Sequence, residues 1–105
     1  MLTVRNNTTS KQQILELKGV LSGIDAMQFR NNAAPIIAIE SGQLVLDVTN
    51  VIEIDLTGFN AVVMLKKEAT NRGLNFSLIA SKENPIQEYI HLSKLNLPSI
   101  EKDIV

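Results

Sequence analysis

The chain has 105 residues, 45% of them hydrophobic, and this length and composition fit one domain with a single core. Ten Lys and Arg residues balance eleven Asp and Glu residues without a long block of either sign, which disfavours nucleic acid as a partner. The absence of cysteine excludes disulfides, thiolate zinc sites and cysteine nucleophiles. We therefore predict one domain over residues 1–105.

The N-terminal segment bears on location. Met1 to Lys11 is polar and lacks the apolar run of a signal peptide, which favours the cytoplasm. No segment approaches the roughly 20 consecutive apolar residues of a membrane-spanning helix. We expect a cytoplasmic protein without membrane insertion.

The first third of the chain predicts two strands and a helix. Gln13 to Leu21 alternates in part between apolar and polar residues, which is typical of a strand, and Leu2 to Arg5 is a shorter segment that can pair with it as a hairpin. From Asp25 to Glu40 the apolar residues are spaced as on a helix, with Asp25 as the expected N-cap. Pro35 predicts a kink, or a break between two short helices, near Ala34.

The middle of the chain predicts a buried strand followed by a helix. Gln43 to Val48 is a short apolar run bounded by turn residues, as expected of a central strand. A second apolar segment, Val51 to Ile54, leads into the sequence Asp55-Leu56-Thr57-Gly58. The helix that follows runs from Phe59 to about Asn71, and Gly73 is its expected C-cap.

The last third adds a strand and a helix. Leu74 to Ala80 is the strand, and Asn84-Pro85 opens the helix. Asn96 to Val105 is expected to pack on the body of the domain. Strands that alternate with helices predict an α/β fold with parallel crossovers. The buried stripe of the last helix is expected to comprise Ile86, Tyr89, Ile90, Leu92 and Leu95.

The reactive side chains form no recognisable catalytic set. His91 is the single histidine, and no serine lies in a Gly-x-Ser-x-Gly turn, so a Ser-His-Asp triad has no support. Carboxylates are not clustered at metal-ligand spacing, and no glycine-rich phosphate loop is present. The segment at Asp55 differs from the Asp-Thr-Gly of aspartic proteases by the inserted Leu56. We expect no metal, no cofactor and no enzymatic activity.

The turn before the middle helix is the remaining candidate site. Asp55 and Thr57 can each accept a hydrogen bond from a free amide of the first helical turn, and Gly58 lets the backbone fold closely. The simplest interpretation makes Thr57 a helix cap that contributes about 1 kcal/mol of stability.

The stretch from Leu44 to Leu78 resembles the STAS domain, a family that includes bacterial anti-sigma-factor antagonists. The family pattern is a strand ending in Asp, a short connection, Asp-Ser-Ser/Thr-Gly before a helix, and a glycine that closes the helix. The resemblance extends to Leu17–Leu21, which is similar to the second strand, and to Ile90–Leu97, which is similar to the last helix. The residues that fall on the pattern are Asp47, Asp55, Thr57, Gly58 and Gly73.

This resemblance implies a STAS-like single domain, with a mixed sheet of four to five strands and about four helices. It also implies a protein partner, namely an anti-sigma factor with serine/threonine kinase activity that phosphorylates the residue before the motif glycine, here Thr57. The sequence departs from the pattern at Leu56, where serine is usual, and at Phe59, where leucine is usual. The residues expected to contact the partner are Asp47, Asp55, Leu56, Gly58 and Phe59.

Two other functional classes remain open. STAS domains also serve as interaction subunits of transport ATPase complexes, in which the threonine contacts a protein and is not modified. An enzyme or a small-ligand sensor is the third class, and the absence of a catalytic set disfavours it. A phosphate at Thr57 would support the anti-sigma-factor antagonist, whereas a permanent complex with unmodified Thr57 would support the interaction subunit.

Overall fold

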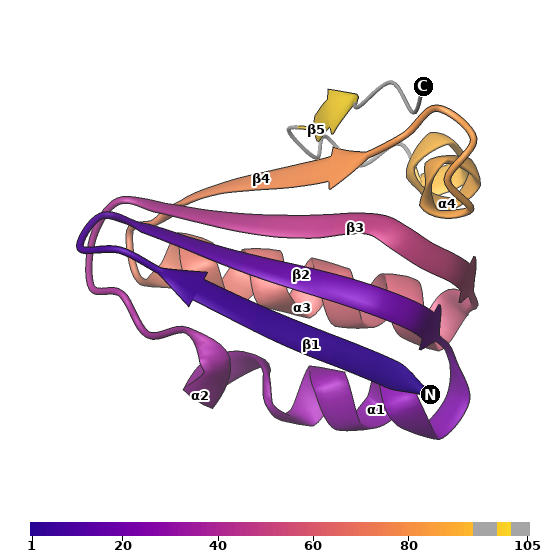
Figure 1. The fold of residues 1–105 in the computed structure, drawn as a ribbon, viewed down its shortest axis with the longest axis horizontal. Coiled ribbons are helices and arrows are strands. Elements are labelled where there is room, and N and C mark those ends of the chain that lie inside the picture. The colour runs from indigo at the N-terminus through magenta and orange to yellow at the C-terminus, as the bar shows by residue number, and fades with distance from the viewer. Residues whose placement is uncertain (94–98, 102–105) are drawn as a thin grey trace.

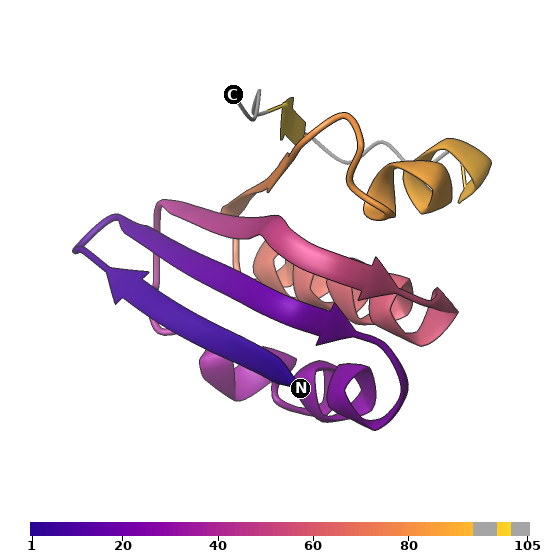
Figure 2. The same cartoon turned by 45° about the vertical axis from the view of Figure 1, so that its right-hand side comes forward.

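The computed structural model describes residues 1–93 and 99–101. Within them one five-stranded sheet has the order β1-β2-β3-β4-β5. Helices α1, α2 and α3 cover one face of this sheet, and α4 lies at the carboxyl end of β4 (Figures 1 and 2). The strands are β1 (Leu2–Thr8), β2 (Gln12–Leu21), β3 (Gln43–Ile54), β4 (Asn75–Ala80) and β5 (Ser99–Glu101), and the helices are α1 (Gly23–Asn31), α2 (Ala33–Ile36), α3 (Leu56–Asn71) and α4 (Ile86–Ser93).

The sheet is mixed, as predicted. β1 and β2 form an antiparallel hairpin, which extends three residues beyond the predicted Leu2–Arg5 because pairing continues to Thr8 opposite Gln13. The pairs β2–β3, β3–β4 and β4–β5 are parallel. β5 lies within the segment that we expected only to pack on the domain. The residues of that segment outside 99–101 lie outside the described part of the chain.

β3 is one continuous strand where the sequence predicted two segments. Its pairing with β2 shifts register twice, between Glu16 and Lys18 and between Gly19 and Val20. At each shift β3 carries one extra residue, which is the signature of a β-bulge. The spacing of its core residues therefore changes from two to three, in the series Leu44, Leu46, Val48, Val51 and Ile54.

The first predicted helix is divided, and its start was placed wrongly. α1 begins at Gly23 after the N-cap residue Ser22, so Asp25 lies inside the first turn and is not the cap. The break expected near Ala34 falls at Asn32. Pro35 lies in the first turn of α2, where a backbone N–H has no intrahelical acceptor, so proline is tolerated there.

α3 ends as predicted, and its C-terminus holds α2 in place. Gly73 has a φ of +75°, a left-handed conformation that favours glycine after a helix. The guanidinium of Arg72 donates to the carbonyl oxygens of Ala34 at 2.8 Å and Ile37 at 3.3 Å. The end of α3 is thereby tied to the chain that follows α1.

α4 is fixed at its start and exposed at its end. The buried Asn84 side chain donates to the Val48 carbonyl oxygen at 2.7 Å and accepts from the amide of Ile86 at 3.0 Å. Ile86 is fully buried, but Leu92 is 70% exposed, so its predicted place in the buried stripe was wrong. Leu92 is exposed because α4 lies at the carboxyl end of β4 and does not pack across the face of the sheet (Figure 1). Leu95 lies outside the described residues.

Candidate functional site

Asp55 is the cap of α3, at the point where β3 ends. Its backbone is extended, with φ −117° and ψ −174°, and its Oδ1 accepts a hydrogen bond from the Gly58 amide at 2.8 Å. The Phe59 amide donates to the Asp55 carbonyl oxygen at 2.9 Å and begins the helical pattern. The expectation that Thr57 caps the helix was therefore wrong, because Thr57 lies inside the first turn.

The second carboxylate oxygen of Asp55 reaches another helix. Oδ2 accepts a hydrogen bond from the amide of Gly23, the first residue of α1, at 3.0 Å. The bonds from Gly23 and Gly58, in that order of importance, hold the pKa of Asp55 below its ordinary value. One ionised side chain therefore joins the N-termini of α1 and α3, where helix dipoles favour negative charge.

Gly58 permits the close approach of α3 to the sheet. A Cβ placed on this residue would lie 1.9 Å from the carbonyl oxygen of Leu21, the last residue of β2, and 2.9 Å from the Ile54 side chain. No side chain fits there, so the predicted contact residue Gly58 is buried and positions the turn by its backbone.

Phe59 is also buried, although it was predicted to contact a partner. Its ring stacks on that of Tyr89 in α4, with 5.6 Å between centroids and an interplanar angle of 22°. Such offset stacking stabilises the packing of α3 on α4. The aromatic substitution at this position therefore serves the core.

The accessible part of the turn is a threonine beside exposed apolar residues. Thr57 is half-buried, and within the described residues its hydroxyl has no hydrogen-bond partner. The side chain of Leu56 is 61% exposed, so this departure from the family pattern points outward. Ile24 at the start of α1 and Ile52 near the end of β3 are 73% and 78% exposed. We call Ile24, Ile52, Asp55, Leu56 and Thr57 the turn surface.

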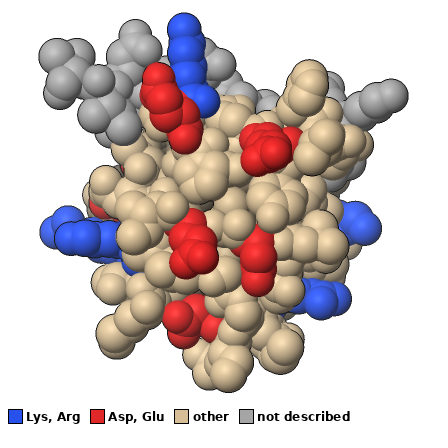
Figure 3. Space-filling model, turned by 90° about the vertical axis from the view of Figure 1, so that its right-hand side faces the viewer, with Lys and Arg blue, Asp and Glu red and all other residues tan. Residues whose placement is uncertain are grey.

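Acidic side chains surround the turn surface. Asp25 lies in the first turn of α1, and Glu53 is exposed near the end of β3, two residues before Asp55. Figure 3 looks onto this end of the molecule and shows carboxylates across the middle of the face, with Lys and Arg only at its margins. A further negative charge at Thr57 would add to this local excess.

Asp47 does not join the turn surface. It lies in the middle of β3, eight residues before Asp55, with its side chain on the opposite face from Leu46 and Val48. Its Oδ1 accepts hydrogen bonds from the Thr49 amide at 2.9 Å and the Thr49 hydroxyl at 2.5 Å. These bonds lie at the first β-bulge, so Asp47 shapes the strand that leads to the turn.

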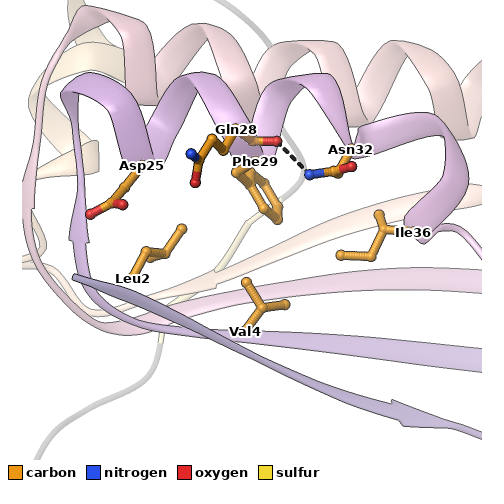
Figure 4. Close-up of a pocket in the computed structure, with 7 residues that line it drawn as sticks. All are labelled: Leu2, Val4, Asp25, Gln28, Phe29, Asn32 and Ile36. Atoms are coloured by element: carbon orange, nitrogen blue, oxygen red, sulfur yellow. Dashed lines mark hydrogen bonds between the residues drawn. The ribbon is translucent and has the colours of Figure 1, made fainter.

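A hollow of about 190 Å³ lies between α1 and the edge strand β1 (Figure 4). Two of its polar side chains have partners, since the Asn32 side-chain amide donates to the Gln28 carbonyl oxygen at 2.9 Å and the Asp25 carboxylate lies 3.6 Å from the Met1 amino group, and the Gln28 side chain is exposed. The hollow therefore presents no buried polar group aimed at a ligand. The residues that line it are Leu2, Val4, Asp25, Gln28, Phe29, Asn32 and Ile36.

Comparison with known families decides the identity of the fold. A family model described as "Mlab, STAS domain" matches residues 4–97. The chain is a STAS domain. The STAS fold confirms the predicted α/β class and the predicted family. Among curated proteins, no sequence matches significantly.

Two solved structures share the architecture of this STAS domain. An anti-sigma factor antagonist from Mycobacterium paratuberculosis superimposes with a TM-score of 0.76 and 18% identity, over 97% of this chain and 87% of that chain. The anti-sigma factor antagonist SpoIIAA in its unphosphorylated form gives 0.71 and 13%, over 96% and 90%. At these identities the likeness establishes the fold alone. No helix among the described residues of the STAS domain is long and apolar enough to cross a membrane.

Sequence reasoning missed the contribution of α1 to the site. It did not predict that the Gly23 amide binds Asp55, because that contact joins residues 32 positions apart. Ile24 and Ile52 were also missed, because an apolar residue in a helix or a strand is usually buried and only the structure shows that both side chains are exposed.

Proposed function

We propose that this STAS domain is an anti-sigma-factor antagonist-like regulator. In its unphosphorylated form it binds an anti-sigma factor with serine/threonine kinase activity through the turn surface, and phosphorylation of Thr57 releases it. The observation that carries the proposal is the Thr57 hydroxyl in the first turn of α3, which has no hydrogen-bond partner among residues 1–93 and 99–101 and lies beside the exposed Leu56. The protein is the substrate of the kinase in this scheme and needs no catalytic residues. The cytoplasmic location and the single domain over residues 1–105 stay predictions.

The charge of a phosphate explains the release. Phosphorylation adds about −1.5 to −2 charges at pH 7. The amide of Gly58 is already occupied by Asp55, so the phosphate would lie beside a carboxylate with few free donors. A partner surface fitted to the neutral hydroxyl and to Leu56 would meet electrostatic repulsion and a desolvation cost.

Exposed apolar side chains support binding of a protein. Ile24, Ile52 and Leu56 are each more than half exposed and belong to three elements that meet at Asp55. Apolar side chains exposed together at one end of a molecule indicate an interaction site more strongly than isolated apolar residues, which are normal on a surface. Burying Leu56 alone would contribute about 1 to 2 kcal/mol to binding.

The same exposure favours a second candidate function. In a constitutive interaction subunit of a transport ATPase complex, the partner would cover Ile24, Ile52 and Leu56 permanently, and Thr57 would contact it unmodified. This arrangement removes the cost of leaving the apolar turn surface in water in a released state. The two candidates differ in whether phosphate reaches Thr57.

Mass spectrometry after incubation with ATP and the co-purifying anti-sigma kinase tests the switch. We expect one phosphate on the wild-type protein and none on Thr57→Val, which removes the hydroxyl and keeps the side-chain shape. Thr49→Val is the matched control, since its hydroxyl lies at the bulge and not on the turn surface. A phosphate on Thr49 or Ser77 would contradict the proposal.

Binding measurements separate the candidates. Under the switch, Thr57→Glu weakens partner binding at least about tenfold, and cells contain both modified and unmodified protein. Under the constitutive alternative, Thr57→Glu also weakens binding, but the protein isolated from cells carries no phosphate and stays with its partner throughout purification.

A further inference from the structure

A groove runs between α1 and α3 on the outer side of the helical layer. The two helices lie side by side and run in the same direction (Figures 1 and 2). Asp55 joins their N-termini, and Arg72 joins the end of α3 to the segment after α1. The half of the groove nearer the C-termini of α1 and α3 holds a hollow of about 220 Å³. The residues that line it are Arg30, Asn31, Ala33, Ala34, Met64, Lys67, Glu68 and Asn71.

Helical spacing extends the groove from this hollow to the turn. Thr57 lies seven residues before Met64 and therefore on the same side of α3, two turns nearer the N-terminus. Met27 lies three residues before Arg30 on α1 in the same way. The groove from Thr57 to Lys67 is about 15 Å long at 1.5 Å per residue. We call Met27, Arg30, Ala34, Thr57, Met64 and Lys67 the α1–α3 groove.

The α1–α3 groove is apolar in its middle and basic at its far end. Met27 and Met64 are 53% and 40% exposed, one on each wall. Arg30 and Lys67 follow them, and neither forms an ion pair within the part of the chain that the structure describes. The nearby Glu68 carboxylate already lies 3.9 Å from the Arg72 guanidinium. As far as the described residues show, the far end therefore carries two cations without an ion pair.

We infer that the α1–α3 groove binds an amphipathic helix of the protein partner, with its acidic end over Arg30 and Lys67. A groove between two packed helices can accept the side-chain ridges of a third helix. Methionine side chains adapt to the apolar residues of such a ligand. Carboxylates on the ligand complement Arg30 and Lys67 and set its direction.

The position of Thr57 gives this docking a means of regulation. Thr57 lies on the wall of the groove at the end nearest the turn, so a helix seated on Met27 and Met64 would pass over its hydroxyl. A phosphate there would place charge against the apolar part of the ligand. This link to Thr57 rests on the proposed function, whereas the docking of a helix does not.

Synthetic peptides test the chemistry of the groove on the full chain. The probe is a helical peptide of about 18 residues with an apolar stripe and glutamates in its last turn. A second peptide carries lysines in place of the glutamates, and a third has the first composition in scrambled order. Binding is followed by amide chemical shifts in NMR titrations and by fluorescence anisotropy.

We expect the acidic peptide to shift amides of α1 and α3 and to bind at least about tenfold more tightly than either control peptide. Met64→Glu should weaken its binding about tenfold, whereas Leu92→Glu, at a more exposed apolar residue on α4, should not. Lys67→Glu should reverse the preference between the acidic and the basic peptide.

Three results would overturn the inference. They are no shift at about 1 mM acidic peptide, equal binding of the scrambled or basic peptide, and shifts confined to elements other than α1 and α3. Phosphate on Thr57 is measured separately by mass, without peptide. Loss of the groove inference therefore leaves the proposed switch standing, and loss of the switch leaves the groove.

Discussion

Replacement of Asp55 by asparagine probes the junction between α1 and α3. The side chain accepts one hydrogen bond from Gly58 at 2.8 Å and one from Gly23 at 3.0 Å. Asparagine keeps the size of aspartate and one acceptor oxygen, but its amide nitrogen cannot accept the second bond. It also removes a negative charge at two helix N-termini.

The expected loss of stability is about 1 to 2 kcal/mol for Asp55→Asn. Asparagine remains a good N-cap, so most of this loss comes from the hydrogen bond to Gly23, at about 0.5 to 1.5 kcal/mol, and from the helix dipoles, at about 0.3 to 1 kcal/mol. Asp55→Ala removes both acceptors and should cost about 2 to 3 kcal/mol.

Urea denaturation between pH 7 and pH 3 measures this effect and its origin. Because the folded pKa of Asp55 is lowered from 3.8, the ionised carboxylate stabilises the fold fully above that value. Its contribution is lost as pH falls through the lower folded pKa. The stability difference between wild type and Asp55→Asn should therefore be constant near neutral pH and should shrink below 3.8.

Glu53→Gln is the control. Glu53 is exposed two residues before Asp55, so this substitution removes the same charge from the same end of the molecule. We expect it to change stability by less than about 0.5 kcal/mol. Equal effects of Glu53→Gln and Asp55→Asn would refute the reasoning, because they would assign the loss to general electrostatics and not to the two hydrogen bonds.

Three further substitutions test other contacts by urea denaturation. Gly58→Ala should destabilise the fold by more than about 2 kcal/mol, although alanine normally favours helix, because its Cβ would meet the Leu21 carbonyl oxygen at 1.9 Å; unchanged stability would contradict the close approach. Asn84→Ala should cost about 2 to 3 kcal/mol, since it leaves the buried Val48 carbonyl oxygen without its donor. Gln13→Leu should cost about 2 to 4 kcal/mol, because the fully buried Gln13 amide makes three hydrogen bonds; a neutral effect of either change would refute its role.

The sequence predicted the order of the main elements because their apolar periodicity is strong. It placed the end of α3 at Asn71 and the glycine after it correctly, since Gly73 takes a conformation that few other residues adopt. It divided β3 at Thr49-Asn50 because these residues are typical of turns. The structure uses them at a β-bulge, where pairing with β2 continues on both sides.

The candidate site was predicted in place but not in detail. The sequence indicated the segment from Asp55 to Gly58, yet it gave the cap to Thr57, because both residue types cap helices and only the backbone decides which one precedes the first turn. Phe59 appeared to be a contact residue until its packing on Tyr89 was known. Tertiary contacts of this kind join distant residues, and local spacing does not encode them.

The double hydrogen bond of Asp55 has a mechanical consequence. Rotation of the Asp55 side chain would break both bonds, because Gly58 binds Oδ1 and Gly23 binds Oδ2 of the same carboxylate, so that the two amides would then exchange their protons with solvent in one opening event. At that end α1 can move away from α3 only when the Gly23 bond breaks or the carboxylate turns away from Gly58. A charge placed next to this carboxylate would act on both bonds at once, so a modification of the turn would also bear on the start of α1.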